Sequence, residues 1–477
     1  MISHSTVRRV IGPLAVVLAT GLVGGAGATA TSHRAATPGS SGIGDTYFPA
    51  DGNGGIDVQS YAVHDRYALA SKRLRGSTRI TLLATQDLSS FNLDFLLGVR
   101  KVTVDGVRAD HAKPSEHELR ITPAAPIATG TTVTVVVDYD GRPARHRYEG
   151  ESNWLANGRE AVAMNEPHMA PWWFPSNDHP RDKALMDITI TVPRGKEVVA
   201  NGRLVDKSSH KSTTTWHWRA DEPMSTYLAF FAAGDFEIDR GTHQGLPWLV
   251  AASKALPPRA TRASMRQLRR SPAIVKSLEA DLGAYPFSVT GGLVTALDPG
   301  FALENQTRPT YPALGSGSTS LLVHELAHQW FGDDVGIDQW RDIWLNEGAA
   351  TFMEARYAET HGGPAGAAWL QSQYAAFGAG DSFWRTPVVD PGEADIFDNA
   401  VYTRGGMALQ ALRNRIGEQA FWTLLPTWLS TRSGANGSSE QFEALAAQVS
   451  GEDLTGFFQA WLRDRAKPAK TADNGLL

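Results

Sequence analysis

The stretch His324-Glu325-Leu326-Ala327-His328 says more about the fold and the chemistry of this chain than any other. On a helix, residues four apart lie on one face, so both imidazoles project in the same direction and can bind one Zn²⁺. Glu347 follows with 18 residues between it and His328, and its carboxylate can complete a set of three protein ligands. Three ligands leave a fourth position for water, as in a catalytic zinc site. Glu325 is then placed to act as general base, and the pattern predicts a zinc-dependent peptidase.

The alternative interpretation of this stretch is an amphipathic helix whose polar residues face solvent. The residues around the motif are apolar, so both histidines would be partly buried and would need partners. Residues 344–350 read WLNEGAA and predict a second buried helix that carries a carboxylate, and buried carboxylates are rarely unpaired. These features favour metal ligation. The apolar residues around the motif are Leu321, Leu322, Val323, Leu326, Ala327, Trp330 and Phe331.

Composition narrows the classes of function that the chain can have. Its 477 residues are 42% hydrophobic and 20% charged, which is typical of globular protein and allows several domains. The formal net charge of −5 gives no indication of a nucleic-acid or anionic-membrane partner. The chain has no cysteine, so thiol nucleophiles, thiolate ligands and disulfides are excluded, and only His, Asp and Glu remain to hold a metal.

The N-terminus has the pattern of a targeting segment. Arg8 and Arg9 precede an apolar stretch of 14 residues, Val10 to Val23, and small residues follow at 26–30. The alternative is a membrane anchor, but this stretch is too short to cross a hydrocarbon layer of about 30 Å. We therefore expect a cleavable signal peptide over residues 1–30, a secreted, extracellular protein, and no membrane span in the mature chain. Residues 31–44, rich in Ser, Gly, Ala and Thr, predict a flexible leader.

Residues 45–240 predict an N-terminal antiparallel β domain. Short runs with alternating apolar and polar residues are separated by turn-forming dipeptides. The expected strands include residues 79–84, 131–137 and 187–192, and the expected hairpin turns are at residues 105–106, 140–141 and 201–202. The aromatic residues of this part are expected in its core rather than on a binding surface. They are Trp216, Trp218, Tyr227, Phe230 and Phe231.

Residues 241–465 predict a mostly helical domain. Apolar residues recur at helical spacing over residues 259–283 and 405–462, and the two motif helices are expected around 318–331 and 344–360. Residues 431–440 predict a polar loop between helices, and residues 466–477 a short polar tail. The expected fold class is therefore α+β and multidomain, with an N-terminal antiparallel β domain followed by a mostly helical domain that carries the predicted zinc ligands.

The motifs together resemble those of the aminopeptidase N family of zinc metallopeptidases, whose catalytic domain is thermolysin-like. Residues 324–333, HELAHQWFGD, look like the zinc helix of the family, and residues 344–348, WLNEG, look like the helix of the third ligand. The resemblance extends from about Tyr47 to Leu462. It implies one Zn²⁺ per chain, bound by His324, His328 and Glu347, with Glu325 as the base.

A third segment resembles the exopeptidase motif of the family. Residues 301–305 read FALEN, where the family has Gly-Ala-Met-Glu-Asn. The resemblance implies that Glu304 binds the free α-amine of a peptide substrate, and that Ala302 and Asn305 also contribute to substrate binding. Phe301 replaces the glycine and Leu303 replaces the methionine, so the backbone contacts to substrate differ from the family pattern.

Two further residues acquire a role from the resemblance. Residues 401–407, VYTRGGM, resemble the segment with the catalytic tyrosine of the family, so Tyr402 is expected to stabilise the oxyanion. Arg404 stands where lysine is common. Asn165-Glu166-Pro167 resembles the loop of the β domain that reaches the active site, and Glu166 is expected to be a second carboxylate near the substrate ammonium.

The expected activity is removal of N-terminal residues from peptides with a free N-terminus. The chain resembles a short form of the family without the C-terminal helical domain, so we expect a more open cleft. A zinc endopeptidase with an open cleft, a family branch that also hydrolyses a fatty-acid epoxide, and a non-catalytic peptide-binding module remain alternatives. The sequence specifies neither the oligomeric state nor the preferred N-terminal residue.

Overall fold

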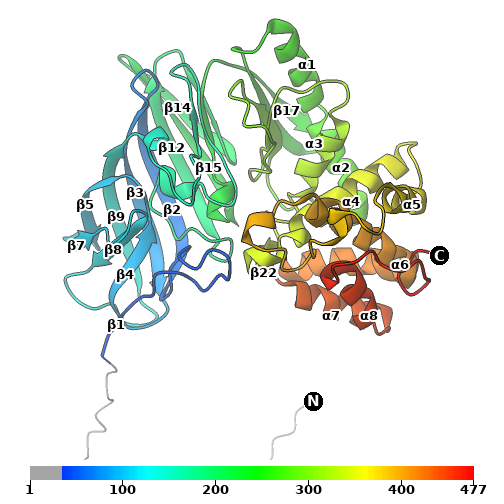
Figure 1. Cartoon of the computed structure of the whole chain (residues 1–477). Helices are drawn as coiled ribbons and strands as arrows, with labels where there is room; N and C mark the ends of the chain where they lie inside the picture. The colour runs from blue at the N-terminus through cyan, green and yellow to red at the C-terminus, as the bar shows by residue number, and fades with distance from the viewer. Residues whose placement is uncertain (1–34) are drawn as a thin grey trace, which may run out of the picture. The chain divides into compact units, whose positions relative to one another are not determined.

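The computed structural model of the chain describes residues 35–477. Its largest sheet has eight strands and lies in the N-terminal part (Figure 1). Apolar residues alternate along strand β2 (Ile56–Ala68), and Val58, Tyr61, Val63 and Tyr67 are buried on one face. All neighbouring strands are antiparallel except β12 and β2. The strand order is β14 (Arg203–His210), β15 (Thr213–Met224), β12 (Ala184–Pro193), β2, β3 (Arg73–Ala84), β9 (Thr132–Gly141), β5 (Gly98–Val104) and β6 (Val107–Arg108).

Two four-stranded sheets complete the β-rich part. The first has the order β1 (Thr37–Pro38), β4 (Leu88–Asp94), β8 (Glu118–Thr122) and β7 (Asp110–Ala112). The second has the order β10 (Trp154–Ala156), β11 (Ala161–Ala163), β16 (Phe231–Gly234) and β13 (Glu197–Ala200). Short 3₁₀ turns at Pro143–Arg145, Ala170–Trp172 and Thr226–Leu228 connect these strands. The five aromatic residues predicted to form core are all buried, as Trp216, Trp218, Tyr227, Phe230 and Phe231 are each at most 4% exposed.

The helical part begins with a sheet of its own. Strands β17 (Phe236–His243), β18 (Leu246–Ser253), β19 (Thr290–Val294) and β20 (Thr310–Tyr311) are neighbours in that order. The predicted boundary between residues 240 and 241 falls inside β17. The long helices are α1 (Pro258–Leu268), α2 (Ser271–Leu282), α3 (Thr319–Ala327), α4 (Trp344–Thr360), α5 (Gly366–Ala376), α6 (Gly405–Arg432) and α7 (Ser439–Ser450). The short elements are α8 (Thr455–Phe458), β21 (Gly336–Ile337), β22 (Asn436–Gly437), 3₁₀ turns at Trp340–Asp342, Ser382–Trp384 and Glu393–Asp395, and π-helical turns at Ala400–Arg404 and Gln459–Arg463.

This architecture confirms the predicted fold class, an N-terminal β-rich part followed by a mostly helical part. Within residues 35–477, no helix combines the length and the apolar composition needed to cross a membrane. The predicted signal peptide, residues 1–30, lies outside the described residues.

Several predicted local features are wrong. The flexible leader is not flexible over its described part, because β1 pairs with β4 and Gly39 N donates to Ser90 O at 2.8 Å. A Cβ at Gly39 would lie 2.5 Å from Gly54 O, so glycine is needed for this close approach. The polar tail packs as well, since Leu476 is 1% exposed and its carbonyl accepts a hydrogen bond from α5.

Two of the three predicted hairpin turns are also wrong. Residues 105–106 form the turn between β5 and β6, as expected. Residues 140–141 instead end strand β9, where Asp140 forms ion pairs with Arg73 and Arg100. Residues 201–202 connect β13 and β14, which belong to different sheets. The helical run over 259–283 is two helices with a break at residues 269–270, and the first motif helix ends at Ala327 rather than 331.

Buried polar contacts hold the β-rich part against the helical part. Asp45 Oδ2 accepts from Trp340 N at 2.9 Å, and Lys183 Nζ donates to the carbonyls of Asp333 and Asp334 at 2.8 Å each. Arg308, which is fully buried, donates to the carbonyls of Gly202 at 3.0 Å, Leu249 at 3.3 Å and Ala200. The guanidinium also lies 5.2 Å from the ring of Trp218. Carbonyls of β13, of the turn after it and of β18 therefore depend on one side chain.

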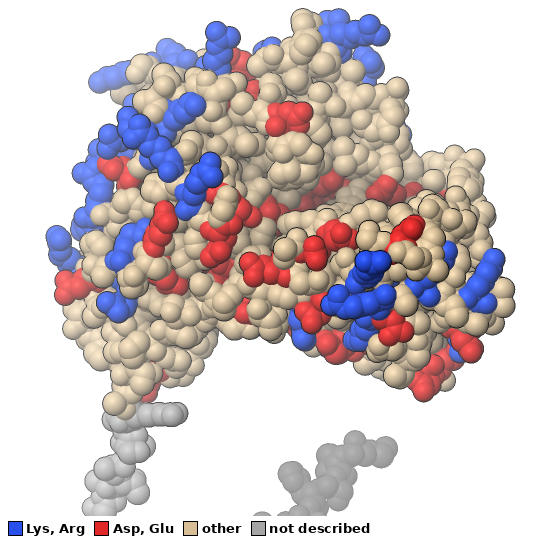
Figure 2. All heavy atoms as spheres, in the orientation of Figure 1, with Lys and Arg blue, Asp and Glu red and all other residues tan. Residues whose placement is uncertain are grey.

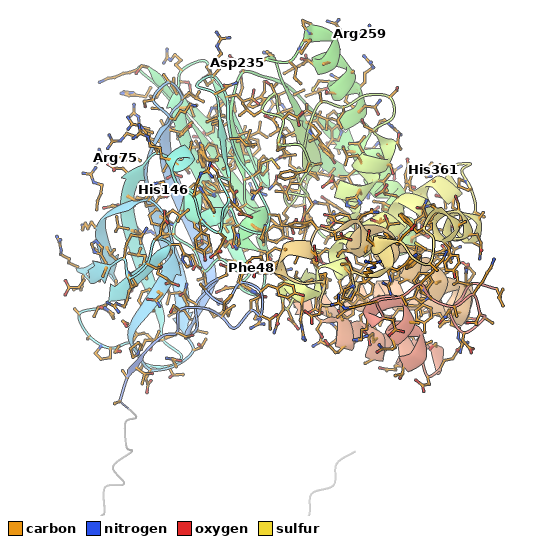
Figure 3. All side chains as sticks on the ribbon, viewed as in Figure 1. Phe48, Arg75, His146, Asp235, Arg259 and His361 are labelled. Atoms are coloured by element: carbon orange, nitrogen blue, oxygen red, sulfur yellow. The ribbon has the colours of Figure 1, made fainter. Side chains whose placement is uncertain are left out.

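We predict that Arg308→Met lowers the free energy of unfolding by about 3 kcal/mol, because buried carbonyls lose their donors. Urea denaturation followed by tryptophan fluorescence measures the change. Arg259→Met is the matched control, since Arg259 is exposed at the start of α1 (Figure 3). Equal stability of the two variants would contradict this role of Arg308.

Candidate active site

Helix α3 brings the two motif histidines together. His324 lies in its last turn and His328 follows its last residue with helical backbone angles, so the four-residue spacing is maintained. The two ring centroids are 4.8 Å apart, and the residues are 9% and 1% exposed. The short distance between the rings agrees with the prediction that both imidazoles lie on one face of the helix.

Glu347, in the first turn of α4, completes a cluster of three potential metal ligands. Its Oε2 lies 3.2 Å from His324 Nε2 and 3.3 Å from His328 Nε2. Zinc bonds of about 2.0–2.1 Å in a tetrahedral site require donor atoms about 3.3 Å apart. The two distances from Glu347 match this separation, all three donor atoms lie within 4.8 Å of one another, and their types, two imidazoles and one carboxylate, suit zinc.

The other nitrogen of each imidazole has a partner that sets the orientation of the ring. His324 Nδ1 lies 2.8 Å from Glu354 Oε1, and His328 Nδ1 lies 3.1 Å from Phe331 O. The Nδ1–H groups donate outward, so the Nε2 atoms are left for a metal. The sequence interpretation missed Glu354. It follows Glu347 by seven residues, two turns along the same helix, and this spacing was the available signal.

The charges of this cluster stabilise one another in the absence of a cation. Burial opposes the ionised form of Glu347, but the imidazoles of His328 and His324 hold the pKa of its carboxyl well below its usual range. Burial likewise opposes charge on His328, but Glu347 and Glu304 raise the pKa of its imidazole. A metal ion must therefore displace protons from the imidazoles when it binds.

Glu325 lies beside the ligands but is not one of the three. Its side chain is buried, and it lines the same cavity as His324, His328 and Glu347. Burial raises the pKa of the Glu325 carboxyl to about 8, and the two imidazoles act against this rise. A carboxyl with a raised pKa near neutrality can both accept and return a proton.

Tyr402 is held next to the ligand cluster by a close contact of two helices. A Cβ on Gly348 would lie 2.9 Å from Gly405 Cα, so the backbones of α4 and α6 approach each other closely there. Gly348 follows Glu347, and Tyr402 lies in the π-helical turn directly before α6. Its ring is nearly parallel to that of His324, with centroids 5.9 Å apart. Burial and then the charge of Glu347 raise the pKa of the phenol well above its usual range, so the phenol keeps its proton.

Two more carboxylates come from distant segments. Glu304 lies between β19 and β20, and Glu166 lies in the loop that follows β11 of the β-rich part. Both line the cavity, and each has one buried oxygen, Oε1, without a hydrogen-bond partner. Burial, and then the charge of Glu304, raise the pKa of the Glu166 carboxyl well above its usual range. Two such groups in one cavity favour a cationic ligand between them.

The other residues of the predicted exopeptidase motif differ in position. Ala302 lines the cavity. Asn305, also predicted to contribute to substrate binding, does not line the cavity: its amide donates to Leu228 O at 3.2 Å and so holds the segment against the β-rich part. Phe301 lines the cavity and is 41% exposed, and Phe397, which the sequence interpretation missed, is 39% exposed on the same cavity.

The three predicted metal ligands, Glu325, Tyr402, Glu304 and Glu166 all line one cavity of about 610 Å³. Its walls contain five glutamates and no lysine or arginine, so the cavity carries an excess of negative charge. Figure 2 shows acidic side chains along a hollow on this face of the protein. Asp333, which is fully buried, adds a further carboxyl whose two oxygens have no partner. The glutamates in the cavity wall are Glu166, Glu304, Glu325, Glu347 and Glu354.

Comparisons with known proteins agree with this arrangement. Residues 315–461 match the peptidase family M1 domain, and residues 58–228 match the peptidase M1 N-terminal domain. A leucyl aminopeptidase of Saccharolobus solfataricus is 27% identical over 442 residues, which is 87% of this chain and 54% of the relative. Human endoplasmic reticulum aminopeptidase 1 is 28% identical over 69% of this chain and 37% of its own length. The chain thus spans about half, or less, of the length of these relatives.

Solved structures match over a larger share of their length. An M1 zinc metallopeptidase of Deinococcus radiodurans, bound to a Tyr-Ser-Ala substrate, superposes with a TM-score of 0.82 at 27% identity. The match covers 90% of this chain and 100% of that chain. A second structure of an M1 zinc metallopeptidase from that organism has a TM-score of 0.81 at 28% identity, and covers 90% and 99%.

We predict that Glu354→Gln weakens zinc binding by about 10- to 100-fold, because the amide is a poorer partner for His324 Nδ1. Competition with a chromogenic chelator measures the dissociation constant. Glu393→Gln, which removes the same charge at an exposed position, is the control. If both variants bind zinc as the parent does, Glu354 has no part in holding the ligand.

Proposed function

The chain belongs to peptidase family M1, and from this premise we propose that it is a zinc-dependent aminopeptidase, which hydrolyses the first peptide bond of peptides with a free N-terminus. One observation carries the proposal. The cavity that contains the three zinc ligands also contains Glu304 and Glu166, each with a buried oxygen that lacks a partner. A substrate ammonium group supplies the donors and the positive charge that these two carboxylates lack.

His324, His328 and Glu347 would hold a zinc ion, which would supply polarisation of the scissile carbonyl and a water molecule with a pKa of about 7. Glu325 accepts the proton of the attacking water and later returns it to the leaving amine. Burial suits Glu325 to this exchange, because the neutral and ionised forms of its carboxyl are then close in free energy near neutral pH. A divalent cation on the neighbouring ligands favours the ionised form, which is the form that acts as base.

Tyr402 donates a hydrogen bond to the oxygen that becomes negative as the carbonyl is attacked. The raised pKa of its phenol keeps the proton in place, and the contact between α4 and α6 fixes the ring beside His324. A donor that is already in position needs no reorganisation during the reaction.

The carboxylates of Glu304 and Glu166 determine which bond is cut. They hold the α-amine at one end of the cavity, so the first carbonyl of the chain is the one that reaches Glu325. Phe301, Leu321 and Phe397 form an apolar wall of the same cavity, which suits an apolar side chain on the first residue.

The test compares a peptide that begins with leucine and its N-acetylated twin, both incubated with the zinc-loaded protein. We predict stepwise loss of N-terminal residues from the free peptide alone, since acetylation removes the charge that Glu304 and Glu166 bind. Glu304→Gln should lower kcat/KM for the free peptide by about 100-fold, as expected when one partner of a buried ion pair is lost. Mass spectrometry of the products over time measures both effects.

Two variants serve as controls in this experiment. Glu325→Gln should bind zinc without turnover, which excludes a contaminating protease, and the exposed substitution Glu393→Gln should leave kcat/KM unchanged. Internal cleavage of both peptides would indicate an endopeptidase instead. Absence of any chelator-sensitive cleavage would favour a non-catalytic peptide-binding module.

We also infer that the protein is secreted, on the support of the basic and apolar pattern of residues 8–23 and the small residues at 26–30. We predict that expression of the whole chain in a secreting bacterial host yields protein in the medium that begins shortly after Ala28 or Ala30. N-terminal sequencing tests this. Recovery of the uncut chain from the cells alone would contradict it.

A further inference from the structure

A second cluster of metal-ligating side chains lies in the β-rich part, outside the cavity described above. Asp94 is the last residue of β4, and His117 and Glu118 stand at the start of β8. Each offers one ligand atom, and these atoms lie within 4.8 Å of one another. The residues are 1%, 4% and 5% exposed, so the cluster is buried rather than a group of acidic residues on the surface.

Several oxygen atoms converge on one nitrogen of this cluster. His117 Nε2 lies 3.4 Å from Asp94 Oδ1 and 3.9 Å from Glu118 Oε1. The carbonyl of Ala50 is 3.1 Å from the same nitrogen, and the hydroxyl of Tyr148 is 3.3 Å from it. A single N–H group can donate to only one or two of these four oxygens. A cation beside the nitrogen could be bound by several of them together.

The carboxylates of the cluster have oxygens that nothing else satisfies. Asp94 Oδ2 accepts from Asp178 N at 2.7 Å and from Asn53 Nδ2 at 3.2 Å, which fixes this carboxylate with Oδ1 toward His117. Asp94 Oδ1 and both carboxylate oxygens of Glu118 have no hydrogen-bond partner. Burying a carboxylate without a partner costs free energy, so these oxygen atoms favour a positively charged ligand.

The charged groups of this cluster are two carboxylates and one imidazole. Among the ion pairs of residues 35–477, Asp94 and Glu118 pair only with His117, and no lysine or arginine reaches either of them. The nearby His168 is engaged elsewhere, by Asp51 at 2.6 Å and by Glu151 at 3.2 Å. Two buried carboxylates therefore face one imidazole, and a divalent cation would compensate both charges.

We propose that Asp94, His117 and Glu118 form a second metal site, which binds a divalent transition-metal ion such as Zn²⁺ or Mn²⁺. The imidazole nitrogen selects these ions over Mg²⁺ and Ca²⁺, which prefer ligand sets made only of oxygen. The carbonyl of Ala50 is placed to be a fourth ligand. A cavity of about 500 Å³ reaches His117 from the surface and is also lined by Glu116, Arg147 and Glu149.

The ion would have a structural role. Its ligands come from β4, from β8 and from the loop that contains Ala50, which are separate segments of the chain. Phe48, which is labelled in Figure 3, lies in the same loop as Ala50. Its ring packs edge-on against His168 at 4.8 Å and against Trp340 of the helical part at 6.2 Å. An ion that fixes this loop also fixes the contact between the two parts of the protein.

The test counts metal ions in the whole protein after it has been stripped with chelator, loaded with excess Zn²⁺ or Mn²⁺, and desalted. We expect two ions per chain by native mass spectrometry, and one per chain in Glu118→Gln and in Asp94→Asn. Glu116→Gln is the matched control, because it removes an exposed carboxylate one residue from the ligands; it should keep two ions. Glu118→Gln should still cleave peptides, since its change leaves the catalytic cavity intact.

A second measurement uses the parent protein and therefore tests the proposal even if a variant does not fold. The parent protein with one zinc bound is titrated with Mn²⁺, and binding is followed by water proton relaxation, with Ca²⁺ as competitor. Saturable binding of one Mn²⁺ that Ca²⁺ does not displace, with a rise in melting temperature, supports the site. One ion per chain under every condition, an unchanged count in Glu118→Gln, or displacement by equimolar Ca²⁺ would overturn the proposal.

Discussion

A buried excess of negative charge is the constraint on which the catalytic cavity depends. Five glutamates line one cavity with two imidazoles and no lysine or arginine, so they cannot all be ionised without added cations. In the proposed function, a zinc ion on His324, His328 and Glu347 and a substrate ammonium between Glu304 and Glu166 would provide those charges. Binding and catalysis would then use the same electrostatic imbalance. The cluster at Asp94, His117 and Glu118 repeats this imbalance on a smaller scale in the β-rich part.

The cavity is assembled across the two parts of the protein, and this explains how polar contacts between them bear on function. Glu166 comes from a loop of the β-rich part, whereas the zinc ligands come from α3 and α4. Arg308 donates to carbonyls on both sides of this junction, and Lys183 donates to the carbonyls of Asp333 and Asp334, a few residues after the motif histidines. Side chains outside the cavity therefore hold together the two parts that supply Glu166 and the predicted metal ligands.

Local patterns predicted the structure well where neighbouring residues decide it. The alternating runs became β3, β9 and β12, and the second motif helix begins and ends where it was predicted. The errors have a common cause. The dipeptides at 140–141 and 201–202 have the composition of hairpin turns, but their strands pair with distant partners. Within residues 37–44, Thr37 and Pro38 pair with β4, and residues 41–42 form bridges with Asn53. Local composition does not indicate which distant strands will pair.

The sequence by itself determined that His324 and His328 lie on one face, because residues four apart on a helix always do, and from this it predicted the metal ligands and the base between the histidines. Resemblance to a family suggested Glu304, Glu166 and Tyr402, but not where their side chains lie. Only the tertiary structure decided that these three share a cavity with the zinc ligands, that Asn305 faces Leu228 instead, and that Glu354 orients His324. The reason is physical: helical periodicity is set by local backbone geometry, whereas these contacts arise from the packing of segments tens to hundreds of residues apart.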